Sequence, residues 1–258
     1  MTQSTVFMAE MTWPEFGACL EDGPVVFLPT GMLEQHGPHL PMGVDHLLPT
    51  AIAAMVAHEI NGIVAPPINY GYKSMPRTGG GPSFPGSTGL DGATLIAVVR
   101  DVIRELARHG VRRICVIDGH FENLWFLNEG IDLAMREVGD TGLRVMCLQH
   151  WEFLTRDTLD VVFPDGFPGI ELEHAAVLET SLMMHFYPEL VRTDRIPDNA
   201  PMEAPPYDVW PSRQEWVPAS GALTSAALAS PEKGAIMVEQ YRRDMTTAVR
   251  RELIGRGR

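Results

Sequence analysis

The feature that most constrains the fold is an alternation of short apolar runs with longer segments that carry apolar residues at helical spacing. Four runs have the length and composition of buried strands: residues 25–28, 62–67, 113–117 and 143–148. This alternation predicts parallel strands with helices on both faces. The chain has 258 residues, enough for one full core. We therefore expect a single-domain α/β sandwich over residues 1–258, with a mostly parallel central sheet flanked by helices.

Helical segments are predicted around these strands. They cover residues 12–20, 47–61, 91–110, 123–138 and 231–253, and a further helix is expected to open at Glu173-His174. Thr12 and Glu15 form a capping-box pattern at the start of the first helix. These predicted helices supply the layers that cover the sheet.

Two long segments lack regular periodicity. Residues 70–89 are rich in Gly, Pro and Ser, and a loop of this length inside a compact domain is often functional, so we expect it to cover a substrate. Its triple glycine at 79–81 lacks the Gly-Lys-Ser/Thr of a phosphate-binding loop. The Pro-rich residues 188–231 can frame the site or wrap a neighbouring subunit.

Two clusters of carboxylates and histidines directly follow strand-like runs. Glu34, His36 and Asp45 come after the first run, and His120 and Glu122 come after the third. Because ligands of an open α/β sheet gather beyond the carboxyl ends of its strands, the clusters are expected to meet. Their oxygen and nitrogen ligands suit Zn²⁺ or Mn²⁺, and five ligands fit two ions that share a bridging carboxylate. The alternative is that the histidines only satisfy hydrogen bonds in polar loops.

Such a centre can supply a nucleophile for hydrolysis without a Ser or Cys residue, and the family resemblance described below implies that the bond broken is an amide. A hydroxide that bridges two ions would attack the carbonyl, because metal ions lower the pKa of bound water. No catalytic triad or nucleophile elbow is evident in the sequence. The leaving nitrogen then needs a proton, and His174 is the candidate donor because an imidazole titrates near neutrality.

The net charge and the cysteines exclude other classes. The formal net charge of −13, with scattered basic residues, argues against a nucleic-acid partner. Cys19, Cys115 and Cys147 show no C-x-x-C spacing and are interpreted as reduced structural residues. No apolar run is long enough to span a membrane and no signal-peptide pattern is present, so no membrane partner and a cytoplasmic location are expected.

Motifs along nearly the whole chain resemble the creatininase (creatinine amidohydrolase) family. They are Glu34-Gln35-His36-Gly37-Pro38-His39 with Asp45, then residues 70–74, 79–81, 84–86 and 90–94, Gly119-His120, Glu173-His174, Glu179-Thr180-Ser181 and residues 205–209. The resemblance implies a creatininase-like fold, a small-molecule substrate, a homo-hexamer, and ring opening of creatinine to creatine with two divalent ions per subunit, Zn²⁺ or Mn²⁺ or both.

The resemblance also implies roles for single residues. Glu34, Asp45 and His120 would bind one ion, and His36, Asp45 and Glu122 the other. His174 would transfer the proton, with Glu122 and Glu179 as the other catalytic residues and His39 in a supporting position. Thr78, Gly119, Phe121, Trp151 and Ile170 would line the substrate pocket, although a lone Trp such as Trp151 is as often a core residue.

Four positions depart from the family pattern. Ile170 stands where creatininase has a pocket Trp, Phe121 where it has Tyr, Thr78 where it has Ser, and Asp118 where it has Asn. The metal ligands are intact but the substrate side of the pocket is changed. Two alternatives follow: a family member that acts on another small C–N substrate, such as a cyclic urea, a lactam or a formamide, and a metal-stabilised binding protein without catalysis.

Overall fold

The computed structural model describes residues 5–255, and these contain a four-stranded sheet with all neighbouring strands parallel. The strands are β1 (Val26–Thr30), β2 (Ile63–Val64), β3 (Arg113–Asp118) and β4 (Arg144–Gln149), in the spatial order β2-β1-β3-β4. β1 pairs with β3 from Val26 opposite Ile114 to Thr30 opposite Asp118. The predicted parallel sheet is confirmed, although β2 is shorter than the expected residues 62–67.

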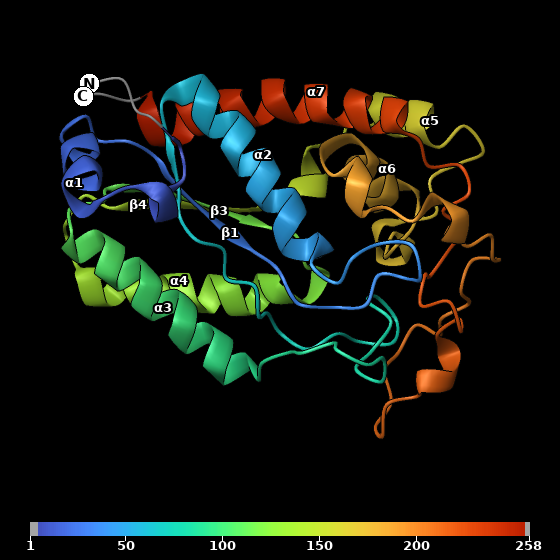
Figure 1. Ribbon diagram of the computed structural model, residues 1–258. Helices are drawn as coiled ribbons and strands as arrows, with labels where there is room; N and C mark the ends of the chain where they lie inside the picture. Colours follow the sequence, from blue (N-terminus) through green and yellow to red (C-terminus); the bar gives the residue numbers. More distant parts are fainter. Residues whose placement is uncertain (1–4, 256–258) are drawn as a thin grey trace.

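Helices cover both faces of the sheet (Figure 1). α2 (Val44–Ile60), α6 (Val177–Phe186) and α7 (Pro231–Val249) pack on one face, and α1 (Trp13–Glu21), α3 (Gly92–Arg108) and α4 (Leu124–Val138) pack on the other. Alternate strand residues enter the two cores: Phe27 and Cys115 face the first group of helices, whereas Val26 and Ile114 face the second. Both faces of the sheet are therefore buried, which explains the continuous apolar runs and confirms the predicted sandwich.

The helix ends follow local sequence signals. The backbone N–H of Thr12 donates to the Glu15 carboxylate over 2.6 Å at the start of α1, as the capping-box pattern predicts. Asn61 ends α2 in the left-handed region, with φ of 57°. The side chain of Ser230 caps α7 by accepting from the backbone N–H of Lys233. These local contacts fix where the layers begin and end.

The structure differs from the prediction at two helices. The short α5 (Arg156–Val162) was not predicted. Glu173 and His174 do not open α6, which begins at Val177, because Ala175 adopts a left-handed conformation with φ of 54°. The Glu173 carboxylate instead accepts from the backbone N–H of Leu178 and caps the helix from outside. Glu173 and His174 therefore lie in a buried turn.

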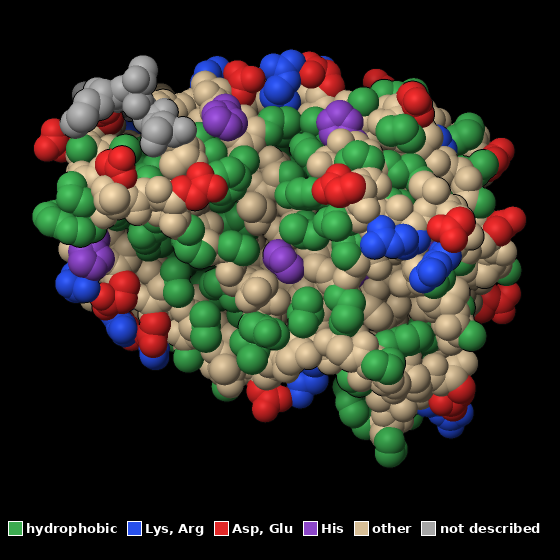
Figure 2. Space-filling view, viewed as in Figure 1, with side chains coloured by type: hydrophobic (Ala, Val, Ile, Leu, Met, Phe, Trp, Pro, Cys, Tyr) green, Lys and Arg blue, Asp and Glu red, His purple; other side chains and the backbone are tan. Residues whose placement is uncertain are grey.

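The remaining regular segments are short. They are 3₁₀ turns at Met8–Glu10, Phe121–Asn123, His150–Phe153, Ile170–Leu172, Pro188–Leu190, Thr193–Arg195 and Gln214–Trp216, and a π-helical turn at Arg250–Ile254 that continues α7. Residues 70–89, all described, contain only isolated bridges, as expected of a long loop. No helix among residues 5–255 is long and apolar enough to cross a membrane. On the face drawn in Figure 2, Lys and Arg side chains lie scattered among acidic ones.

The strand order determines where a site can form. The chain leaves β1 toward β2 on one side and returns to β3 on the other, so β1 and β3 are neighbours where the direction of winding reverses. In open parallel sheets, ligands bind beyond the carboxyl ends of the strands at such a point. The segments that follow β1 and β3, including the first turn of α2, carry the two predicted ligand clusters.

Candidate metal centre and active site

Four chain segments bring the predicted ligands together. Glu34 and His36 lie in the loop after β1, Asp45 lies in the first turn of α2, and His120 follows β3. The side chains of all four are almost completely buried. The turn before α6 and its first residues complete the cluster with His174 and Glu179. The two clusters therefore lie together beyond the carboxyl ends of β1 and β3, as expected.

Gly119 permits the close approach of β3 to α2. A Cβ atom at this position would overlap the backbone carbonyl of Asp45 and contact the ring of Pro49. Any larger residue at 119 would push the first turn of α2 away from the end of β3. The glycine therefore determines how near Asp45 lies to His120.

Asp45 lies between two histidines and faces each with a different oxygen. Its Oδ1 is 2.9 Å from Nε2 of His36, and its Oδ2 is 3.2 Å from Nδ1 of His120. Two groups of possible ligand atoms share this carboxylate: Glu34, Asp45 and His120, and His36, Asp45 and Glu179. In each group the atoms lie within 4.8 Å of one another. A single bridging carboxylate between two ions has this geometry.

Backbone carbonyls orient both histidines. Nδ1 of His36 lies 3.2 Å from the carbonyl oxygen of Glu34, so this nitrogen donates and leaves Nε2 toward Asp45. Nε2 of His120 lies 2.9 Å from the carbonyl oxygen of Tyr72, which leaves Nδ1 toward Glu34 and Asp45. Metal-binding histidines are commonly oriented in this way, with the other ring nitrogen donating to a carbonyl.

Buried polar atoms without hydrogen-bond partners collect at the same point. Both carboxylate oxygens of Glu34, Nε2 of His36, Oδ2 of Asp45 and Oε2 of Glu122 have no hydrogen-bond partner among the described residues. Unpaired buried polar atoms are rare and costly in folded proteins. Several buried carboxylates and imidazoles that converge on one point fit divalent cations, so the residues present are suited to hold metal ions of this kind.

The electrostatics of the cluster are strongly coupled. Burial raises the pKa of Glu34 to about 7. Burial alone would lower the pKa of His36, but the carboxylates of Asp45 and Glu179 raise it well above its ordinary value. The pKa of His120 is also raised, against the effect of burial, by Glu122, Asp45 and Glu34. Without metal, the histidines therefore hold protons that neutralise the carboxylates.

Glu122 and Glu179 occupy different places from those expected. Glu179 lies 3.6 Å from Nε2 of His36 and shares its ligand group, where the resemblance assigned Glu122. Oε1 of Glu122 instead accepts from the Thr78 hydroxyl over 2.5 Å and from the Met75 backbone N–H over 3.0 Å. Its unpaired Oε2 is 3.2 Å from Nε2 of His120. Glu122 therefore borders the centre with Oε1 held by hydrogen bonds and Oε2 in ion-pair contact with His120.

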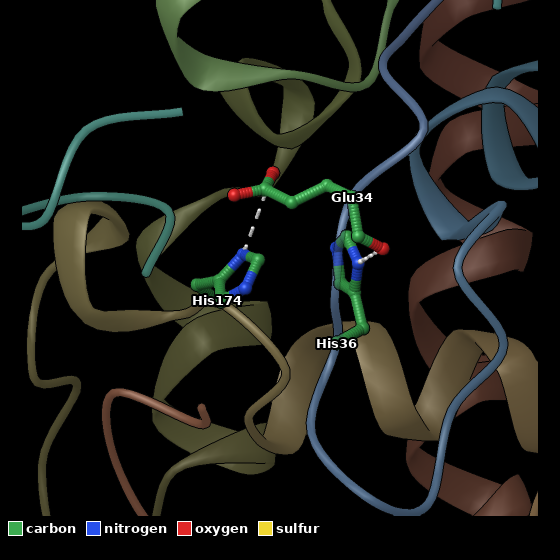
Figure 3. A group of neighbouring side chains, drawn as sticks. All are labelled: Glu34, His36 and His174. Carbon is green, nitrogen blue, oxygen red and sulfur yellow. Dashed lines mark hydrogen bonds and ion pairs between the residues drawn. The ribbon is translucent and has the colours of Figure 1, made fainter. Parts of the chain in front are cut away.

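His174 and Glu34 face one another across the cluster (Figure 3). Nδ1 of His174 is 4.0 Å from Oε2 of Glu34, and the rings of His174 and His36 have centroids 4.3 Å apart. Burial lowers the pKa of His174, and the positive charge of His36 lowers it further. The ring is therefore neutral at neutral pH. His39, by contrast, hydrogen-bonds the Thr180 hydroxyl over 2.8 Å and belongs to none of the ligand groups found among the described residues.

Asp118 lies behind the centre as a fully hydrogen-bonded acceptor. Its carboxylate accepts from the Thr30 hydroxyl and from the side-chain amides of Asn123 and Gln149, at distances of 2.8 to 3.0 Å. Burial raises its pKa to about 6. Gln149 also donates to the carbonyl of His120, so this network supports the loop that carries the second cluster.

A pocket opens beside the centre. It has an empty volume of about 390 Å³, part of it open to solvent. All five predicted substrate residues line it: Thr78, Gly119, Phe121, Trp151 and Ile170. The rings of Phe121 and Trp151 are nearly parallel, with centroids 6.4 Å apart, and the buried Trp151 indole N–H has no hydrogen-bond partner in the described part of the chain.

Sequence reasoning missed two residues of the site. Glu173 lines the pocket and is buried, and burial raises its pKa to about 8. Gln35 is buried and its amide contacts His174. Both are direct neighbours of predicted site residues and lie within the family motifs of the sequence, which were the available signals.

Comparisons with known proteins agree over almost the full length. A family model described as creatinine amidohydrolase matches residues 9–249. Creatinine amidohydrolase of Pseudomonas putida is 47% identical over 96% of this chain and 97% of its own length. Mycofactocin precursor peptide peptidase of Mycolicibacterium smegmatis is 29% identical over 67% of this chain and 62% of its own length.

Solved structures give the same result. A mutant creatininase of Zn-Zn type superposes with a TM-score of 0.95 at 46% identity, covering 98% of this chain and 100% of the other. A manganese form of creatininase superposes with a TM-score of 0.94 at 46% identity, covering 97% of this chain and 100% of the other. A mutant creatininase complexed with creatine superposes with a TM-score of 0.93 at 47% identity, covering 96% of this chain and 99% of the other. The resemblance seen in the sequence and the predicted fold are both confirmed: the chain belongs to the creatinine amidohydrolase family.

Proposed function

We propose that this protein is a two-metal hydrolase that opens creatinine to creatine. The observation that carries the proposal is the position of Asp45, which faces His36 with one oxygen and His120 with the other and belongs to both ligand groups. Glu34 would complete one group of ligands and Glu179 the other. When bound, two divalent ions would activate a water molecule and withdraw charge from the substrate carbonyl. The Zn-Zn and manganese forms of similar creatininases support ions of this kind.

The chain's own residues supply the remaining chemistry. Water adds to the carbonyl carbon, and the unpaired Oε2 of Glu122 can accept its proton because Oε1 is held by Thr78 and Met75. The ring C–N bond then breaks, and the nitrogen takes the proton that Glu122 accepted from the water, while the neutral His174 donates a hydrogen bond to it from Nδ1, which faces the centre. The burial of the cluster excludes bulk water from these steps.

The pocket walls suit a small flat ring. Phe121 and Trp151 offer nearly parallel aromatic faces, and the unpaired Trp151 N–H is a free hydrogen-bond donor. A creatininase complexed with creatine covers 96% of the length of this chain, which supports the same ligand class here.

One observation favours a second candidate. Ile170 and Phe121 line the pocket at the two positions where the sequence departs most from the family pattern. An aliphatic side chain offers no stacking face, and a phenylalanine offers no hydroxyl donor. The second candidate is hydrolysis of another small C–N substrate, such as a cyclic urea, a lactam or a formamide. The similarity to mycofactocin precursor peptide peptidase supports this candidate, because that protein is named for a different substrate.

The test is a substrate panel with zinc- or manganese-loaded protein. Creatinine, a hydantoin, a lactam and a formamide would be incubated with the parent protein and with His174→Ala. The proposal expects creatine formation that requires metal and falls by about 10²-fold or more in the variant. Cleavage of another compound without creatinine turnover would favour the second candidate. Metal-induced stabilisation with no cleavage at all would indicate a binding protein.

We further propose the homo-hexamer implied by the family resemblance, and a cytoplasmic location remains a prediction from the sequence. Tyr207 and Trp210 of the Pro-rich segment are 61% and 72% exposed, and exposed aromatic side chains of this size are typical of interaction surfaces. Sedimentation of the protein at six times the mass of one chain would support the hexamer, and a monomeric mass would contradict it.

A further inference from the structure

Gln35 has a completely occupied amide group beside His174. Its Nε2 lies 2.9 Å from Nε2 of His174 and 2.9 Å from the carbonyl oxygen of Gly221. Its Oε1 accepts from the backbone N–H of Gly37 over 2.9 Å. Gln35 lies between Glu34 and His36 in the sequence, yet it belongs to none of the ligand groups found in the described residues.

Two backbone groups determine which way this amide points. If the amide were turned over, its oxygen would face the carbonyl oxygen of Gly221 and its NH₂ would face the N–H of Gly37. Both contacts would then be repulsive, since a carbonyl only accepts and an N–H only donates. The NH₂ group must therefore face Gly221 and, with its second hydrogen, the ring of His174.

The orientation of Gln35 has a direct consequence for His174. A nitrogen that receives a hydrogen bond from an amide NH₂ cannot itself carry a proton. In a neutral imidazole one nitrogen donates and the other accepts, so the proton must be on Nδ1. Nδ1 is the nitrogen that faces Glu34 across the centre, at 4.0 Å.

We infer that Gln35 is a positioning residue that fixes the tautomer of His174, so that the ring presents its N–H to the reacting atoms. The inference rests on the proposed function in one respect, because it takes His174 as the hydrogen-bond donor to the leaving nitrogen. The new element is the role of Gln35, which keeps the proton of His174 on Nδ1. A donor with the opposite tautomer would point its proton at Gln35 instead of the substrate.

Gly221 supplies an independent observation. It has φ of +81°, and a Cβ atom built on it would overlap the Gln35 amide. The Pro-rich segment therefore passes so close to Gln35 that only glycine fits at position 221. The Gly221 carbonyl accepts a hydrogen bond from one of the two amide hydrogens of Gln35. This segment frames the site by holding the group that orients His174.

The test is neutron diffraction from deuterated crystals of the zinc-loaded protein, which locates the proton on each imidazole directly. We expect deuterium on Nδ1 of His174 and none on Nε2. In Gln35→Glu, an acceptor of nearly the same shape replaces the donor, so deuterium should appear on Nε2 of His174. Gln214→Glu is the matched control: Gln214 donates to the nearby Gly80 carbonyl and has no recorded contact with His174 in the described residues, so deuterium should stay on Nδ1.

Three results would overturn the inference. They are deuterium on Nε2 in the parent protein, an Nε2 that stays without deuterium in Gln35→Glu, or a zinc ion bound to Nδ1 in place of a proton. If Gln35→Glu fails to crystallise, the parent map alone decides between the first and third results.

Kinetics separate positioning from a merely structural role. In Gln35→Glu and Gln35→Met, kcat should fall by about 10²-fold or more while KM and the metal content stay near the parent values. Loss of metal from Gln35→Met would contradict a positioning role and indicate a structural one. The parent's own turnover of creatinine tests the proposed function separately, since deuterium on Nδ1 in a protein that does not open creatinine would contradict that function and leave this inference standing.

Discussion

At the scale of single residues, Glu122 and Glu179 occupy different positions at the candidate centre. Glu179 shares a ligand group with His36 and Asp45, whereas Glu122 accepts from Thr78 with one oxygen and has no hydrogen bond on the other. The sequence could not separate them, because both are carboxylates near predicted strands or helices. The distinction depends on which carboxylate the backbone brings within reach of His36.

Substituting each acid by its amide should therefore have different effects. Glu179→Gln should lose one ion, because an amide is a weaker ligand than a carboxylate, and retain about one ion per chain in place of about two. Glu122→Gln should keep both ions but lose turnover by about 10²-fold or more, because an amide cannot accept a proton. Metal analysis after gel filtration, together with turnover, measures both.

The matched control is Glu171→Gln, which makes the same change at an exposed position a few residues before α6. It should keep metal content and turnover unchanged. Loss of an ion from Glu122→Gln with full retention in Glu179→Gln would restore the assignment that the family resemblance implied.

Ile170 lines the pocket with an aliphatic side chain, which offers no stacking face for a flat ring. Restoring the aromatic face with Ile170→Trp should improve kcat/KM for creatinine about fivefold, since a stacked pair contributes about 1 kcal/mol beyond its area. Steady-state kinetics on creatinine and on the best other panel compound measure the effect. Improvement on the other compound alone would show that Ile170 selects a different ring.

The protonation of His36 and His120 predicts how metal binding depends on pH. Carboxylates raise the pKa of both rings well above the ordinary value, against burial. A histidine with a raised pKa stabilises the metal-free fold fully below about pH 6.5, and this stabilisation is lost as the pH rises through its folded-state pKa. Metal ions must displace these protons. For each proton displaced, the apparent metal affinity should therefore rise about tenfold per pH unit.

The difference in melting temperature between zinc-loaded and metal-free protein should accordingly widen from about pH 6 to about pH 8. Thermal unfolding at several pH values, with and without a chelator, measures it. A difference that is constant or shrinks over this range would mean that the ligands are already deprotonated without metal.

At the scale of the elements, the ends of β1 and β3 and the first turn of α2 carry the centre. Their separation depends on Gly119, where a Cβ atom would overlap the carbonyl of Asp45. Gly119→Ala should lower the free energy of unfolding by about 1–3 kcal/mol and weaken metal binding, because Asp45 must move. Gly17→Ala is the control: Gly17 lies in α1 with no atom within 4 Å of an added Cβ. It should raise stability by up to about 1 kcal/mol.

Chemical denaturation and zinc titration of both variants test this coupling. Gly119→Ala with unchanged zinc affinity would show that Asp45 does not depend on the approach of β3 to α2.

The elements themselves were largely predictable. The run at β3 is apolar because the strand is buried on both faces, and the stripe on α3 from Leu95 to Leu106 follows from packing on the sheet. The start of α6 was not predictable, because side chains that bond to backbone N–H groups decide it: Glu173 accepts from Leu178, and Glu179 accepts from Ala175. Such contacts have no periodicity in the sequence.

At the scale of the whole molecule, the winding of the sheet explains why two ligand clusters far apart in the chain meet. Glu34 and His120 come from neighbouring strands at the point where the strand order reverses, so the pairing of the clusters was predictable from the α/β pattern. The contribution of Gly221 was not predictable, since the Pro-rich segment has no periodicity and reaches Gln35 only through the tertiary fold. The site thus combines a predictable sheet edge with a loop contact that only the structure reveals.

The most direct test of a centre built on Asp45 is a titration of zinc into metal-free protein while creatine formation from creatinine is followed. The account predicts that activity rises until two ions are bound per chain, and that Asp45→Asn abolishes both the second ion and the activity. Creatine formation that is complete with one ion, or that persists without metal, would contradict a shared carboxylate between two ions.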